Sequence, residues 1–214
     1  GYVRTLELIP DLADAHLGLA LVRAQQGRAD DAVAHLTDAI KSDPTAPQAY
    51  RTFGAMMLAF EGYQIGIDLL EEFGVALTED PEVVYLLCQL YAKARRIGDL
   101  VDGLELLGEM VHAEPETDVA QASMWLLADR PDRTAELCQR ALDGGAGGVV
   151  AAEAFYHLGL ARDAQGDPAG AMQAFRAAAD AHPAHWQSQN NLATLLLHSG
   201  GDSSMPSPEA IAEA

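Results

Sequence analysis

The sequence predicts an all-α protein, a solenoid of stacked helix–turn–helix repeats. Prolines stand at positions 10, 44, 81, 115 and 183, so their separations are 34, 37, 34 and 68 residues, and 68 is twice 34. A period near 34 indicates a pair of helices that cannot bury its apolar face alone and must stack on its neighbours. Hydrophobic residues make up 49% of the chain but aromatic residues only 6%. This alanine-rich composition favours closely packed helices over sheets.

The proline register assigns residues 1–10 to the end of a preceding repeat and residues 11–143 to four successive repeats. In the first repeat the predicted core positions are Leu19, Ala20, Ala32, Leu36 and Ala39. In the second they are Tyr50, Phe53, Gly54, Gly66 and Leu70. Each set gives one apolar stripe to each of two helices, as the spacing of an amphipathic helix requires.

The third and fourth repeats depart from this pattern in different ways. In the third, Tyr91 is large where a small residue is expected, but Gly103 opposite it has no side chain, so the pair conserves volume. In the fourth, Gln121 replaces an expected leucine and Thr134 an expected alanine, which makes it the weakest repeat. A glycine-rich linker, residues 144–148, is predicted to follow it.

Residues 149–183 form the clearest repeat. Its first helix carries an inward stripe at spacing i, i+3, i+4, made of Phe155, Leu158 and Gly159. Gly166 is expected to end this helix, Asp167 to cap the next one, and Pro168 to occupy its first turn, where no N–H is needed. In the second helix the core positions are Ala171, Phe175 and Ala178.

This fifth repeat resembles the tetratricopeptide repeat family position by position, from Phe155, Leu158 and Gly159 on the first helix to Ala171, Phe175 and Ala178 on the second. The resemblance extends over essentially the whole chain. It implies a right-handed superhelix whose first helices line a concave groove, and a non-catalytic scaffold that presents this groove to a partner protein or peptide.

Residues 184–214 are predicted to be a partial sixth repeat that contains a linker at 201–208. Because the register begins and ends within a repeat, we expect the chain to be a fragment of a larger protein. Arginine occurs eleven times and lysine twice, which with abundant Ala, Gly and Asp indicates a GC-rich bacterial gene. The cytoplasm and the periplasm both remain open as its compartment.

The net charge is −19, with 32 acidic residues against 13 Lys plus Arg. Such a field repels phosphate backbones and anionic lipid, so it argues against nucleic acid and membrane surfaces and favours a basic protein partner. No run of 18 apolar residues exists, so membrane insertion is not expected. Asp99, Asp102, Glu105 and Glu109 share one face of a predicted helix and serve either to steer a basic partner or to keep that face solvated.

The predicted groove surface is the stripe of each first helix that lies opposite its buried stripe. Its candidate partner-binding residues are Leu17, Leu21, Arg51, Tyr85, Cys88, Arg95, Tyr156, Leu160, Asn190 and Thr194. The alternative interpretation is that many of these positions pack against the neighbouring repeat.

The sequence predicts no catalytic residue, cofactor or metal site. No GxSxG or HExxH motif and no supported Cys/His pair is present, and the glycines at 144–148 lack the Lys-Ser/Thr of a phosphate-binding loop. His182 and His185 are neighbours in a turn, but zinc needs three or four ligands and no further Cys or His has a suitable spacing.

Two other functions remain open. The stretches Asn190–Ala193 and Pro208–Ile211 resemble patterns in bacterial polysaccharide-export and biofilm solenoids, so the chain could be an accessory segment of an export machine or of a larger enzyme. A solenoid that ends within a repeat also exposes apolar end faces, through which it could self-associate.

Overall fold

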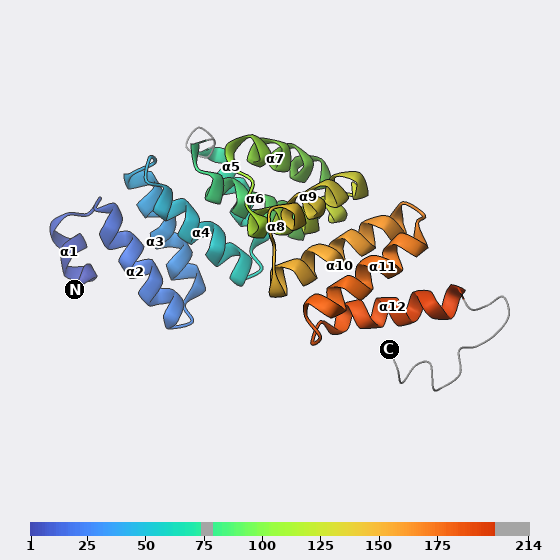
Figure 1. Ribbon diagram of the computed structural model, residues 1–214. Coiled ribbons are helices and arrows are strands. Elements are labelled where there is room, and N and C mark those ends of the chain that lie inside the picture. The colour runs from blue at the N-terminus through green and yellow to red at the C-terminus, as the bar shows by residue number, and fades with distance from the viewer. Residues whose placement is uncertain (74–78, 200–214) are drawn as a thin grey trace. The chain divides into compact units, whose positions relative to one another are not determined.

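The computed structural model describes residues 1–73 and 79–199, which form helices joined by short turns (Figure 1). No strand occurs in these two ranges, so the all-α prediction is confirmed. The chain divides into two compact units, unit 1 from Gly1 to Val111 and unit 2 from His112 onward.

Unit 1 contains one short helix followed by three helical hairpins. The helices are α1 (Tyr2–Leu8), α2 (Ala13–Gln25), α3 (Ala29–Ser42), α4 (Pro47–Ala59), α5 (Tyr63–Glu72), α6 (Pro81–Ala94) and α7 (Ile97–Met110). The main contacts join helices that follow one another or are separated by a single helix, such as α4 and α6. This nearest-neighbour packing is that of a solenoid of stacked hairpins.

Unit 2 repeats the same arrangement. Its helices are α8 (Pro115–Leu127), α9 (Pro131–Asp143), α10 (Gly148–Ala164), α11 (Pro168–Ala181) and α12 (Trp186–Ser199). Here α8 packs on α9 and α10, α10 packs on α11, and α11 packs on α12. The first helices of the hairpins are therefore α2, α4 and α6 in unit 1 and α8, α10 and α12 in unit 2.

The local signals of the fifth repeat are confirmed. Gly166 adopts φ +78° after α10, a left-handed conformation that favours glycine. The Asp167 side chain accepts a hydrogen bond from the Gly170 N–H at 2.8 Å, and Pro168 begins α11. A Cβ added to Gly159 would lie 2.5 Å from the Phe175 ring, so the missing side chain lets this buried ring fill the space between α10 and α11.

The glycine-rich segment is shorter than predicted, because Gly148 is already the first residue of α10. The turn is also tied by backbone hydrogen bonds: the Ala146 N–H donates to Ala141 O at 3.0 Å and the Gly145 N–H donates to Leu142 O at 3.1 Å. Gly145 has φ +89°, so a side chain there would be strained. The segment thus closes helix α9 as a regular C-terminal turn.

The unusual residues of the fourth repeat are buried. Thr134 is fully buried and its hydroxyl donates to Ala122 O at 3.1 Å, which joins α9 to α8. Gln121 is also buried, and its amide nitrogen has no hydrogen-bond partner in the described part of the chain. Thr134 is therefore accepted at a position where alanine is expected, because its buried hydroxyl has a hydrogen-bond acceptor on the paired helix.

The linker predicted at 201–208 and the start of a last helix lie outside the described residues. Within the described ranges no helix combines the length and the hydropathy needed to cross a membrane.

Candidate functional site

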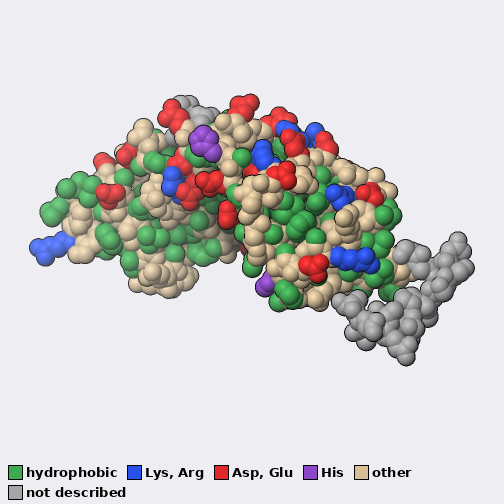
Figure 2. Space-filling view, in the orientation of Figure 1, with side chains coloured by type: hydrophobic (Ala, Val, Ile, Leu, Met, Phe, Trp, Pro, Cys, Tyr) green, Lys and Arg blue, Asp and Glu red, His purple; other side chains and the backbone are tan. Residues whose placement is uncertain are grey.

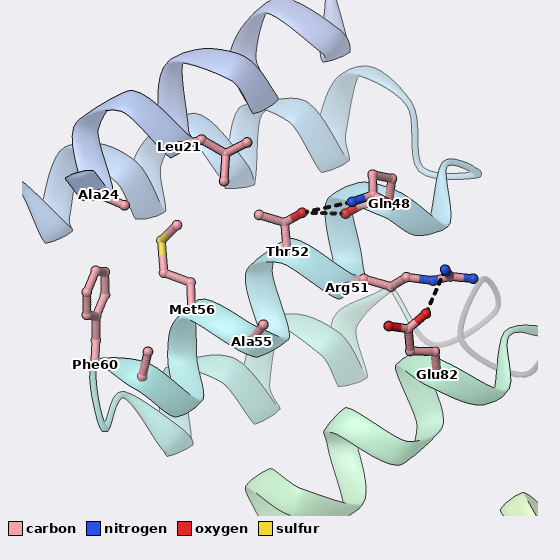
Figure 3. A pocket seen from close by; sticks show the side chains of 10 residues that line it. Leu21, Ala24, Gln48, Arg51, Thr52, Ala55, Met56, Phe60 and Glu82 are labelled. Carbon is pink, nitrogen blue, oxygen red and sulfur yellow. Dashed lines mark hydrogen bonds and ion pairs between the residues drawn. The ribbon is translucent and has the colours of Figure 1, made fainter.

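The first helices of unit 1 form an open pocket of about 490 Å³ (Figure 3). Its lining comes from α2, α4 and the start of α6 and consists of Leu21, Ala24, Gln48, Arg51, Thr52, Ala55, Met56, Ala59, Phe60 and Glu82. Two predicted groove residues, Leu21 and Arg51, are brought together here by the stacking of α4 on its neighbours. Both residues belong to the stripe that the repeat register assigned to the groove.

The floor and one end of this pocket are apolar. Leu21 is 46% exposed and Phe60 is 40% exposed, although both are large hydrophobic residues. Ala55 is also exposed and lines the pocket, and Figure 3 shows Met56 extending from α4 into the space between Leu21 and Phe60. Single exposed apolar side chains are scattered on most protein surfaces. A group of them gathered in one concavity is instead typical of a binding site. Leu17, one turn before Leu21 on α2, is only partly exposed and does not line the pocket.

The other end of the pocket is charged, and its arginine is already paired. Arg51 on α4 contacts Asp80 with Nη2–Oδ2 at 2.7 Å and Glu82 with Nη1–Oε2 at 2.6 Å. Asp80 is the N-cap of α6 and accepts hydrogen bonds from the N–H groups of Glu82 and Val83. Arg51 thus links two hairpins and is held in place at the edge of the pocket.

Asp80 is charged in this arrangement although it is buried. Burial acts to raise the pKa of its carboxyl group, but the hydrogen bonds from Arg51 and from the Val83 and Glu82 N–H groups outweigh it and lower the pKa below its ordinary value. The pair therefore stays ionised at neutral pH and fixes the start of α6 against α4.

The structure separates the three groove residues predicted on α6. Cys88 is fully buried, so its assignment to the groove was wrong: its sulfur lies 2.8 Å from where a Cβ of Gly103 would stand. Burial also raises the pKa of this thiol to about 12. Tyr85 is partly exposed, and Arg95 is exposed and ends the helix with φ +60°. Because Gly103 on α7 has no side chain, Cys88 packs closely against it, and this part of α6 is buried.

In unit 2 the predicted groove residues lie on α10 and α12. Tyr156 and Leu160 are partly exposed, and Asn190 and Thr194 are exposed. The Thr194 hydroxyl donates to the backbone oxygen of Asn190 at 2.9 Å, within its own helix. The first two lie on α10, and the other two lie on α12, the first helix of the next hairpin.

Tyr156 is held by an aromatic cluster. Its ring centroid lies 6.0 Å from that of Phe175, 5.4 Å from that of His157 and 5.1 Å from that of His185. Burial lowers the pKa of His157, against the opposing effect of Glu153 nearby. The cluster joins α10 to α11 and to the turn before α12, so Tyr156 serves packing between repeats.

The acidic stripe lies along α7, where Asp102, Glu105 and Glu109 are exposed. Asp99 pairs with Arg96, with Nε–Oδ2 at 2.7 Å. Acidic side chains are spread over the face drawn in Figure 2, with apolar patches between them. The stripe is on α7, a second helix, whereas the pocket residues come from α2, α4 and the start of α6.

Sequence reasoning missed Met56 and Phe60 as pocket residues. Phe60 follows the last residue of α4, and a period-based register does not assign a residue at a helix end to either face. The signal that could have identified it is its size, because a large aromatic residue next to Glu61 and Gly62 in a turn is hard to bury completely.

The model of the tetratricopeptide repeat matches residues 2–47, 128–185 and 156–201, which together are more than half of the chain. No curated protein sequence matches this chain. Among solved structures the chain is similar to YrrB, described as a TPR protein with an unusual peptide-binding site, at 18% identity and TM-score 0.71, covering 89% of this chain and 96% of that one.

Two further structures are similar over most of their length. MamA is 15% identical with TM-score 0.66, and the match covers 91% of this chain and 98% of that chain. PilF of Pseudomonas aeruginosa is 16% identical with TM-score 0.65, and the match covers 90% of this chain and 86% of that chain. At these identities the structural similarities support the fold, and the repeat match supports the family.

Proposed function

Because the chain belongs to the tetratricopeptide repeat family, whose members generally act as protein-interaction scaffolds, we propose that it is a non-catalytic scaffold that binds a protein or peptide partner in the unit 1 pocket. The observation that carries the proposal is the open concavity on α2, α4 and α6, with exposed apolar side chains in its interior. The peptide-binding site described for YrrB supports the same class of ligand by analogy of fold.

The pocket chemistry suggests what the partner segment carries. Leu21, Ala55 and Phe60 offer apolar surface to a hydrophobic side chain, and burial of such a side chain contributes about 1.5–3 kcal/mol. Gln48 and Thr52 offer polar atoms beside it. With a net charge of −19 the surrounding field attracts cations, so a basic residue next to the hydrophobic anchor would bind faster.

A peptide selection tests this proposal. A random peptide library displayed on phage is selected on the immobilised 214-residue chain, and the enriched sequences are synthesised and titrated in solution. We expect peptides that place a large apolar residue beside Lys or Arg. Ala55→Glu should weaken their binding at least about tenfold, or about 1.4 kcal/mol, because it puts a charged side chain into the apolar part of the pocket.

The matched control is Ile65→Glu. Ile65 is also an exposed hydrophobic residue of unit 1, but it lies on α5 and does not line the pocket. The same charge is introduced in both variants, so a general electrostatic effect would appear in both. Equal losses in the two variants, or none in Ala55→Glu, would refute the pocket as the binding site.

A further inference from the structure

Two histidines and an aspartate meet in the first hairpin of unit 1. His16 near the start of α2 faces α3, and the Nδ1 atoms of His16 and His35 lie 3.3 Å apart. Asp38, one turn after His35 on α3, brings its Oδ2 to 3.9 Å from the same His16 nitrogen. One ligand atom from each of the three residues lies within 4.8 Å of the others.

We propose that His16, His35 and Asp38 bind one divalent transition-metal ion of the zinc type. Zinc–nitrogen bonds are about 2.0–2.1 Å long, so two nitrogens on a tetrahedral zinc ion stand about 3.3 Å apart, as the two Nδ1 atoms do. Imidazole and carboxylate together suit zinc and its neighbours in the first transition row rather than calcium or magnesium. The proposal is independent of the partner pocket.

The hydrogen bond on the far side of His16 gives its ring the tautomer that a metal ligand needs. Nε2 of His16 lies 2.8 Å from the carbonyl oxygen of Pro10. A carbonyl oxygen only accepts, so Nε2 carries the hydrogen and Nδ1 presents its lone pair toward His35 and Asp38. A backbone carbonyl in this role is a common feature around histidine ligands, because it fixes the orientation of the ring.

The cluster can be reached from solvent. A pocket of about 520 Å³ is lined by Pro10, Asp11, His16, Asp38, Lys41 and Ser42. His16 is 9% exposed while Asp38 is exposed, so an ion held by the three residues would have one side open to water or to another ligand. The carboxylates of Asp11 and Asp38 offset the positive charge of Lys41 at the entrance.

The histidines of unit 2 show that proximity alone does not make such a site. Nδ1 of His185 accepts from the Ser188 N–H at 3.3 Å, so its other nitrogen, Nε2, carries the hydrogen. That nitrogen faces Glu153, with Nε2–Oε1 at 3.4 Å. His185 therefore has a cap on one side and a carboxylate on the other, and no free lone pair for a metal.

The competing explanation is a hydrogen bond in which His35 Nδ1–H donates to His16 Nδ1. Isothermal titration of Zn²⁺ into the metal-free 214-residue chain distinguishes the two, with excess Mg²⁺ present to occupy the acidic surface. We expect one tight site per chain. His35→Gln should weaken it at least about 100-fold, because loss of even an outer partner of a ligand costs about 10–100-fold. Asp38→Asn should weaken it about 10-fold.

His112→Gln is the control, since His112 is exposed and stands outside the helices, before α8. His35 is only partly buried, so His35→Gln should keep its fold, which circular dichroism verifies; His16 is more buried and is not used for the test. Co²⁺ provides a second readout, because its visible absorption reports nitrogen ligands and should be lost in His35→Gln. No single tight Zn²⁺ site in the parent chain, or an undiminished one in His35→Gln, would overturn the proposal.

Discussion

Arg51 in unit 1 and Arg140 in unit 2 each bind a buried aspartate, yet they connect different parts of the solenoid. Arg51 on α4 binds Asp80 at the start of α6, in the next hairpin. Arg140 on α9 binds Asp118 on α8, within its own hairpin, with Nη2–Oδ1 at 2.5 Å and Nε–Oδ2 at 2.8 Å. One arginine therefore sets the spacing between repeats and the other closes a single repeat.

The two aspartates also differ in what else they bind. Asp80 accepts hydrogen bonds from two backbone N–H groups as well as from Arg51. The Asp118 side chain is 2% exposed, and in the described part of the chain its carboxylate accepts only from Arg140. Removing the arginine would leave Asp80 capped but Asp118 as a buried, unpaired charge. The repeat pattern fixes the core, whereas such polar links are specific to each unit.

The largest expected effects are in the core, where the two units should behave alike. Phe53 in unit 1 and Phe175 in unit 2 are both fully buried. Phe53→Ala and Phe175→Ala should each lower the free energy of unfolding by about 3–5 kcal/mol, because each leaves a cavity. Urea unfolding followed by circular dichroism measures both. A cost below about 1 kcal/mol at either site would contradict the packing described here.

Removing the arginine should cost more stability in unit 2 than in unit 1. Arg140→Met keeps the apolar stem but strands Asp118, so we expect a loss of about 3 kcal/mol. Arg51→Met should lose only about 1 kcal/mol, since Asp80 keeps its two backbone N–H partners. Urea unfolding of the two variants in the same buffer gives the comparison. Equal losses would show that the backbone N–H groups at Asp80 do not compensate for the arginine.

Acid should affect the Asp80 link in a defined direction. The pKa of Asp80 is lowered in the folded state, so its contribution is complete above the unfolded pKa of about 3.9 and is lost as the pH falls through the folded value. Asp80→Asn keeps a capping oxygen but removes the charge. We expect it to be about 1 kcal/mol less stable than the parent chain at pH 7, with the difference closing at an acidic pH below the lowered pKa of Asp80.

Urea unfolding at the two pH values measures this. A difference that stays constant between them would mean that the charge of Asp80 does not contribute to stability.

The smallest effects concern the cysteines, one in each unit. Burial raises the pKa of the thiols of Cys88 and Cys138 to about 12, so neither should react with a thiol reagent in the native state. Cys138→Ala leaves Cys88 as the probe of unit 1, and Cys88→Ala leaves Cys138 as the probe of unit 2. Reaction rates in low urea then report the local opening of each unit. Rapid labelling of either thiol without urea would contradict its burial.

Much of the fold follows from the sequence because a repeat period is a strong signal. The core positions of Gly159 and Phe175 and the cap by Asp167 were predicted from single residues, and all three are present. Thr134 appeared as a mismatch because a propensity-based register cannot show that the Ala122 carbonyl lies within hydrogen-bond distance.

The groove could be predicted only in part. Leu21 and Arg51 do line one pocket, but the sequence did not reveal that Arg51 is already paired, because Asp80 is 29 residues away. Cys88 is buried because of Gly103, on a different helix. The cluster of His16, His35 and Asp38 was missed for the same reason: its members meet only when α2 packs on α3.

The central proposal is that a partner occupies the pocket on α2, α4 and α6. The most direct test is to titrate a selected peptide into the ¹⁵N-labelled chain and map the amide chemical shifts. We predict changes that centre on residues 21–24 and 48–60, and that are absent from this region when the peptide is added to Ala55→Glu. Changes centred instead on the second helices α5 and α7, with residues 48–60 unaffected, would contradict it.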